Sequence, residues 1–462
     1  MIDAIVTGRS LPALQSALDL AEVGLRVVLL HDSSQAGARP CAERDPDGVI
    51  ADFLKRIAAP VAGAASSEPA AAAKAIAAVA APPMLPHGTE WLRQASPNVL
   101  GIPAVAIASE TIAMIGSGGA FRAYLDRITP LLTVGKTQML GELVRKRMGA
   151  KVRDRLVDPQ VFERYGAESA EVEVAVATPG LNEALSRAGS LSTAVLAYAE
   201  RNVARETRLT PALGTEALVR HMLQLLELYG VEVRSEQAIS IVHESDCWQV
   251  QIESGDSLHA RAIVADVGES AIASEVLLPI VAPVMPSAAR VYASIDINRP
   301  EWLAKGDRAV AQVDDWAIVI DASLEVKGEG GADEPPTESE RQTLTGDVIC
   351  YAVSAAAAVG EHTDLLDRLQ AADASSGTIS GKGIMNTLGC EAPISGASLF
   401  AAPFKTIAQR HEAADALAAL EAARPDLIAV GRAAHGDDQA AALSAAHDAT
   451  VRLRRRLLGL AE

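Results

Sequence analysis

The first thirty residues constrain the fold more than any other segment, because their pattern is that of one strand–helix–strand unit. The apolar run Ala4–Thr7 predicts a buried strand, and apolar residues then recur at helical spacing over Leu14–Ala21. Gly24 is expected at the end of that helix, and Arg26–Leu30 predicts a second strand. The unit has the length expected of a βαβ motif, with Gly8 at the turn after the first strand.

This first turn occupies the position of the dinucleotide fingerprint G-x-G-x-x-G, whose glycine positions read Gly8, Ser10 and Ala13. Gly8 can form the tight turn and Ala13 allows close helix packing, but the Cβ of Ser10 obstructs the approach to a pyrophosphate. Pro12 is compatible with the first turn of a helix. Asp32, 24 residues after Gly8, is the candidate for the ribose hydroxyls. The alternative is a βαβ unit that keeps its fold and no longer binds a nucleotide.

Composition excludes several classes of protein. The 462 residues are enough for two or three domains, and 49% are hydrophobic, so the chain can bury a large core. The net charge of −18 repels phosphate backbones and anionic lipid, which argues against nucleic-acid binding.

The cysteines and the N-terminus predict a cytoplasmic protein. The four cysteines are widely separated and match no zinc-binding spacing, so we expect reduced thiols and no metal site. A predicted strand begins at once, without the basic and apolar regions of a signal peptide. The longest apolar stretch, Ala70–Pro83, is too short to span a bilayer.

Several later segments, taken in order, carry a family resemblance. Gly37-Ala38-Arg39 is followed by Asp47-Gly48, and the stretch Leu140–Pro159 joins a basic cluster to Leu-Val-Asp-Pro. Tyr165-Gly166-Ala167 follows it, and Pro425–Gly431 forms a strand ending in glycine near the C-terminus. In this order the segments resemble the protoporphyrinogen/coproporphyrinogen oxidase branch of the FAD-dependent amine-oxidase-like flavoproteins.

The resemblance implies an α/β fold (α+β overall), with a Rossmann-like FAD/NAD(P)-binding domain and interleaved substrate-binding and helical domains. Residues 61–84 are expected to form a helix flanked by linkers. The implied domains are an FAD-type domain from 1–60, 205–275 and 418–462, a helical capping domain at 85–204, and a mixed β/α substrate domain at 276–417.

FAD is the cofactor that the resemblance implies, but the chain departs from the family at the flavin end as well. An acidic or amide residue of the family is replaced by Arg432, and a loop glycine by Asp438. Carboxylates at Asp437 and Asp438 would repel a reduced flavin, whereas Arg432 could pair with a phosphate or with those aspartates. The candidate cofactor-binding residues are Gly8, Ser10, Ala13, Asp32, Arg39, Ile239, Gly431, Arg432, Gly436 and Asp437.

Three functions stay open. The first is an FAD-dependent oxidase that passes hydrogens from a reduced tetrapyrrole, such as a porphyrinogen, to oxygen. The second is a cofactor-free homologue that acts as a scaffold or binds a ligand. The third is non-redox acid–base chemistry with His435. No nucleophile motif identifies a catalytic residue, and the basic segment from Arg145 to Arg155 is either a solvated helix face or a landing site for substrate carboxylates.

Overall fold

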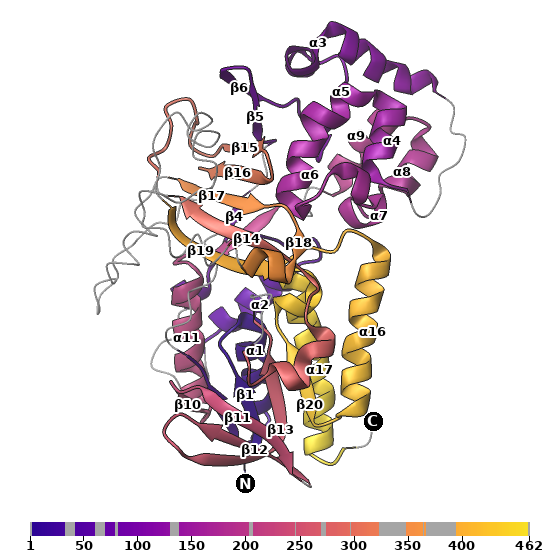
Figure 1. Ribbon diagram of the computed structural model, residues 1–462. Helices are drawn as coiled ribbons and strands as arrows, with labels where there is room; N and C mark the ends of the chain where they lie inside the picture. The colour runs from indigo at the N-terminus through magenta and orange to yellow at the C-terminus, as the bar shows by residue number, and fades with distance from the viewer. Residues whose placement is uncertain are drawn as a thin grey trace.

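The structure is a computed structural model. It describes residues 2–32, 42–60, 70–78, 82–129, 138–202, 207–244, 246–268, 274–295, 297–322, 348–363, 365 and 394–460. The molecule is elongated, with a helical layer at one end, an antiparallel sheet in the middle, and a parallel sheet flanked by helices at the other end (Figure 1).

The parallel sheet contains the N-terminal βαβ unit. Its strands lie in the order β10-β2-β1-β13-β20, which is 3-2-1-4-5 by position in the chain. This is the doubly wound order of dinucleotide-binding folds, so the predicted fold class is confirmed. The strands are β1 (Ile2–Thr7), β2 (Val27–Leu30), β10 (Glu232–Arg234), β13 (Ser257–Asp266) and β20 (Leu427–Val430).

Both faces of this sheet are covered, which explains why its strands are apolar throughout. On β1, Ala4 and Val6 pack toward one set of helices, whereas Ile5 packs toward the other. The antiparallel strands β11 (Ala238–Glu244) and β12 (Cys247–Ile252) extend the first half of β13. The covering helices are α1 (Leu11–Ala21), α2 (Val49–Ala58), α11 (Thr215–Leu228), α17 (Gln439–Leu457), α12 (Leu278–Val281), η5 (Ala282–Val284) and α16 (Ile407–Ala423).

The middle of the molecule is a mainly antiparallel sheet in the order β18-β14-β17-β16-β15-β5-β6, with β19 also paired to β14. A small sheet, β3-β9-β4, accompanies it. The strands of the large sheet are β5 (Met84–His87), β6 (Glu90–Arg93), β14 (Ala288–Ile295), β15 (Arg308–Val313), β16 (Trp316–Asp321), β17 (Ile349–Ser354), β18 (Ala357–Ala358) and β19 (Ile394–Ala401). Those of the small sheet are β3 (Glu43–Arg44), β4 (Ala75–Ala78) and β9 (Arg208–Pro211).

The helical layer follows a short hairpin of β7 (Asn98–Val99) and β8 (Ile102–Pro103). No described helix is both long enough and apolar enough to cross a bilayer. The layer contains α3 (Ser109–Tyr124), η2 (Leu125–Ile128), α4 (Leu140–Met148), α5 (Ala150–Val152), η3 (Arg153–Val157), α6 (Asp158–Tyr165), η4 (Ser169–Glu171), α7 (Val174–Ala177), α8 (Leu181–Ala188) and α9 (Leu191–Arg201).

Two expectations differ from the structure in this region. The helix expected within 61–84 is wrong for the described residues, where a single 3-10 turn, η1 (Ala71–Ala73), leads into strand β4. β4 pairs with β9, so tertiary pairing overrides the helix preference of alanine. The mostly helical stretch expected from residue 85 instead begins with the strands β5 to β8.

Candidate functional site

The carboxyl ends of β1 and β13 meet where the strand order reverses, which is where ligands bind in open α/β sheets. Gly8 follows β1 and Asp266 ends β13. Gly8 has φ +81°, and a Cβ there would lie 2.2 Å from Oδ2 of Asp266. The turn therefore requires glycine for two reasons, its left-handed backbone and the carboxylate packed against it.

The Asp266 carboxylate accepts hydrogen bonds from Ser10 in this turn and from Gly268. Its Oδ2 accepts the Ser10 backbone N–H at 3.0 Å, and its Oδ1 accepts the Ser10 hydroxyl at 2.7 Å. Oδ1 also accepts the backbone N–H of Gly268 at 2.7 Å. Sequence reasoning missed Asp266, although an acidic residue directly after the apolar run Ala262–Ala265 was a signal for a group at this sheet edge.

The first turn of α1 has few backbone donors left for a ligand. Ser10 is the N-cap of α1, and its hydroxyl accepts the Ala13 N–H at 3.4 Å. Pro12 has no N–H. Between Ser10 and Ala13, Pro12 therefore offers no N–H, and the N–H groups of Ser10 and Ala13 already donate to acceptors within the chain. A helix N-terminus favours an anion, and here the chain supplies its own in the Asp266 carboxylate.

The end of β2 brings the ribose candidate next to the start of β11. The Asp32 carboxylate accepts a hydrogen bond from the Gln237 side chain at 2.5 Å. Ile239, two residues further on, is 54% exposed on β11. His31 is buried beside Ser235, 3.3 Å from its hydroxyl, and its pKa is lowered by burial and by the nearby Arg9 guanidinium. The structure thus places Asp32 and Ile239 at one edge of the sheet.

The glycine-containing turn after β20 is closed by an ion pair. Nη1 of Arg432 lies 2.6 Å from Glu43 on β3, and Nη2 lies 3.2 Å from Asp437. The Arg432 side chain is only 5% exposed, so these carboxylates compensate a buried charge. Gly431 packs so closely that a Cβ would lie 2.6 Å from the Gly268 nitrogen. Of the two partners expected for Arg432, the structure shows an aspartate, together with Glu43, which the sequence did not indicate.

The two aspartates at this turn have structural roles. Asp438 is the N-cap of α17, where Oδ1 accepts the Ala441 N–H at 3.0 Å, and a carboxylate there is favoured by the helix dipole. Asp437 pairs with Arg432, and Gly436 has φ +58° and packs so closely that a Cβ there would lie 2.8 Å from the Phe404 ring. The pairing of Asp437 with Arg432 is one of the two that the sequence left open for this arginine.

His435 lies half-buried in the same turn, and its partial removal from water lowers its pKa below the usual 6.5. The pKa of His31 is also lowered. Because the unfolded chain then binds these protons more tightly, stability is fully present above about pH 6.5 and is lost as the pH falls through the folded-state values.

We therefore expect urea unfolding at pH 5.5 to give a smaller free energy of unfolding than at pH 7.5. His435→Gln should reduce this difference, whereas the exposed His259→Gln should leave it unchanged. If the free energy of unfolding changed equally with pH in all three proteins, His435 would not be a source of the pH dependence.

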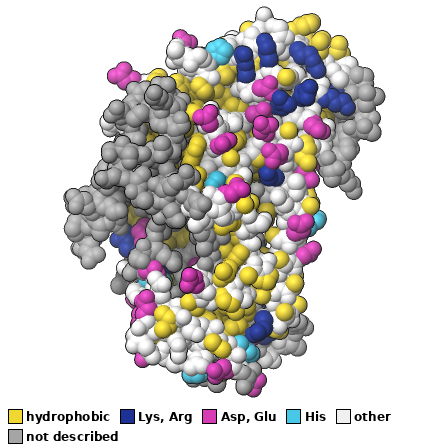
Figure 2. Space-filling model, in the orientation of Figure 1, with side chains coloured by type: hydrophobic (Ala, Val, Ile, Leu, Met, Phe, Trp, Pro, Cys, Tyr) yellow, Lys and Arg dark blue, Asp and Glu magenta, His cyan; other side chains and the backbone are white. Residues whose placement is uncertain are grey.

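The remaining candidates are Arg39 and the basic segment from Arg145 to Arg155. Arg39 lies outside the described residues. In the basic segment, Arg147 is buried against Asp126, while Arg145, Lys146 and Lys151 are exposed. Figure 2 shows Lys and Arg side chains gathered over the helical end of the molecule. Among the described residues no group of His, Cys, Asp and Glu is arranged to hold a metal ion.

Comparison with known proteins connects this geometry to a group of enzymes. Coproporphyrinogen III oxidase of Bacillus subtilis (strain 168) is 20% identical over 211 residues, 44% of this chain and 45% of that protein. The chain thus spans less than half the length of the curated relative that it matches. A candidate protoporphyrinogen oxidase from Exiguobacterium sp. 255-15 superposes with a TM-score of 0.68 at 13% identity, covering 99% of both chains. No protein-family model matches the chain.

A second solved structure, cyclohexylamine oxidase from Brevibacterium oxydans IH-35A, superposes with a TM-score of 0.51 at 12% identity over 99% of both chains. The chain has the fold of the FAD-dependent oxidoreductases. The resemblance to porphyrinogen and amine oxidases that the sequence indicated is thereby confirmed at the level of the fold.

FAD-dependent oxidoreductases of this fold imply a dinucleotide at the switch point, so the residues there can be tested for fit. A pyrophosphate needs the donors and the positive dipole end of the first helix. Here Asp266 and the Ser10 hydroxyl accept two of those donors, and a phosphate would meet the Asp266 carboxylate at the same helix end. The residues present do not fit an FAD pyrophosphate in this arrangement.

Proposed function

We propose that this protein is a cofactor-free, non-redox relative of the FAD-dependent oxidoreductases that works by binding a ligand. The observation that carries the proposal is the Asp266 carboxylate, held by Ser10 and Gly268 at the N-terminus of α1. An anion already satisfies this helix end, so a pyrophosphate gains little there and meets like-charge repulsion.

The contacts of Arg432 support the same proposal. Its guanidinium is directed at Glu43 and Asp437, so the cation that could have neutralised a phosphate is already paired within the chain. One end of the expected FAD site thus holds a carboxylate hydrogen-bonded within the chain, and the other holds an intramolecular ion pair, where the family resemblance led us to expect contacts with a cofactor.

The competing function is an FAD-dependent oxidase of the porphyrinogen or amine-oxidase type, with a small molecule such as a reduced tetrapyrrole as substrate. The fold shared over the full length of a candidate protoporphyrinogen oxidase favours it. In that case the pyrophosphate of FAD would have to displace the Asp266 carboxylate from Ser10, which would break a charge-assisted hydrogen bond.

The two functions differ in the colour of the protein. We expect the purified protein to lack the visible absorbance of flavin, and added FAD to separate from it completely during gel filtration. Intrinsic tryptophan fluorescence should not change on titration with FAD. A yellow protein with one flavin per chain, bleached by dithionite, would overturn the proposal and support the oxidase.

A further inference from the structure

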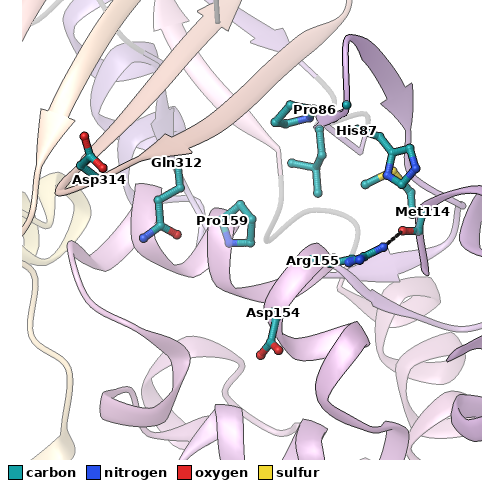
Figure 3. A pocket seen from close by; sticks show the side chains of 10 residues that line it. Pro86, His87, Met114, Asp154, Arg155, Pro159, Gln312 and Asp314 are labelled. Atoms are coloured by element: carbon teal, nitrogen blue, oxygen red, sulfur yellow. Dashed lines mark hydrogen bonds between the residues drawn. The ribbon is translucent and has the colours of Figure 1, made fainter. Parts of the chain in front are cut away.

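A surface cleft lies far from the switch point, between the helical layer and the antiparallel sheet. Its volume is about 560 Å³, within the range of small-molecule sites. It is lined from β5, α3, η3, α6 and β15, so two layers of the molecule build it together (Figure 3). Clefts between structural units are frequent ligand sites.

The floor of the cleft is apolar. Leu85 and Met114 are each 1% exposed, and the rings of Pro86 and Pro159 lie between the two polar sides in Figure 3. Because Leu85 and Met114 are already withdrawn from water, the free-energy gain on binding comes from covering the apolar surface of the ligand and of the exposed Pro86 ring.

One side of the cleft carries basic groups. Figure 3 shows His87 and Arg155 on the same side, with Met114 beside them. Arg155 is exposed, and its Nη1 donates to the Met114 carbonyl at 3.1 Å, which favours a position of the guanidinium at the cleft wall. A guanidinium held in one position binds a carboxylate with less loss of side-chain freedom than a mobile one.

The other polar groups of the cleft favour binding of an anion only on the side of Arg155. Gln312 extends into the cleft from β15, opposite Arg155. Of the two carboxylates in the lining, Asp154 pairs with Arg153 at 2.6 Å, and Asp314 lies at the far edge from Arg155 in Figure 3. A ligand carboxylate at Arg155 is therefore kept away from Asp314.

We propose that this cleft binds a small carboxylic acid with an apolar body. The carboxylate would pair with Arg155 and His87, the apolar body would cover Pro86 and Pro159, and Gln312 would hydrogen-bond a polar group at the other end. The proposal does not depend on whether the switch point holds a dinucleotide, because the two sites share no residues.

The test compares two probes that differ only in charge, 3-phenylpropionate and 3-phenylpropionamide, by saturation-transfer NMR on the full chain. The acid should bind and the amide should bind at least about tenfold more weakly, corresponding to 1.4 kcal/mol. Arg155→Gln should weaken binding of the acid to the level expected for the amide. His87→Ala, at an exposed hairpin, should weaken it as well without endangering the fold.

Arg145→Gln is the matched control, because Arg145 is an exposed arginine of the same layer outside the cleft. It should bind the acid like the unmodified protein. Equal binding of acid and amide, no binding of the acid, or an equal loss in Arg145→Gln would overturn the proposal. FAD titration of the same samples reports separately on the proposed function.

Discussion

Asp266→Ala is expected to destabilise the protein and at the same time to give it an affinity for ADP. The substitution leaves the half-buried N–H groups of Ser10 and Gly268 without their acceptor, where a fully buried donor so left costs about 1–3 kcal/mol. It also frees the N-terminus of α1 for a phosphate. Urea unfolding should show a loss of about 2 kcal/mol that millimolar ADP restores in part.

Asp266→Asn separates the two effects. The amide keeps the shape and one acceptor oxygen, so we expect a smaller loss of stability and no gain of affinity, because the position stays filled. Adding Ser10→Gly to Asp266→Ala should strengthen ADP binding further, since it removes the Cβ and the hydroxyl that accepts the Ala13 N–H. If ADP stabilised the unmodified protein as much as Asp266→Ala, Asp266 would not be the group that occupies this site.

The largest loss of stability is expected for Asp126→Ala in the helical layer. Asp126 is fully buried and lies 2.6 Å from Nε of Arg147, whose side chain is 4% exposed. It also accepts the Ser192 N–H at 2.9 Å. Removing one partner of a buried ion pair leaves an uncompensated charge and costs about 3–5 kcal/mol, measurable by urea unfolding.

The control for this prediction is an exposed ion pair. Glu171→Ala removes the partner of Lys405 at the surface, where such pairs contribute about 0.2–1 kcal/mol. Asp126→Ala/Arg147→Met should be more stable than Asp126→Ala alone, because it also removes the buried charge that has lost its Asp126 carboxylate. A midpoint shift for Asp126→Ala no larger than that for Glu171→Ala would contradict the prediction.

Local sequence patterns predicted the framework of the parallel sheet. The strands at Ala4–Thr7 and Arg26–Leu30 and the helix between them are present, with bounds shifted by one to three residues. These elements follow from apolar periodicity and helix-ending residues, which act over a few positions in the chain.

The same patterns failed where pairing with a distant strand decided the structure. Ala75, Ala77 and Ala78 have a high helix preference, but their segment pairs with β9, 130 to 136 residues away, and forms β4. The basic segment read as one continuous face, yet Arg147 turns inward because Asp126 is buried beside it. Composition and periodicity carry no information on which distant residue an element meets.

The sequence by itself determined that this chain builds a doubly wound α/β unit and that its dinucleotide fingerprint is altered at Ser10. Only the tertiary structure decided what the altered site contains. Asp266 reaches Ser10 across 256 positions of the chain, and Glu43 reaches Arg432 across 389. The order of the strands brings β13 beside β1, so the carboxylate and the helix end that it fills become neighbours only when the sheet is assembled.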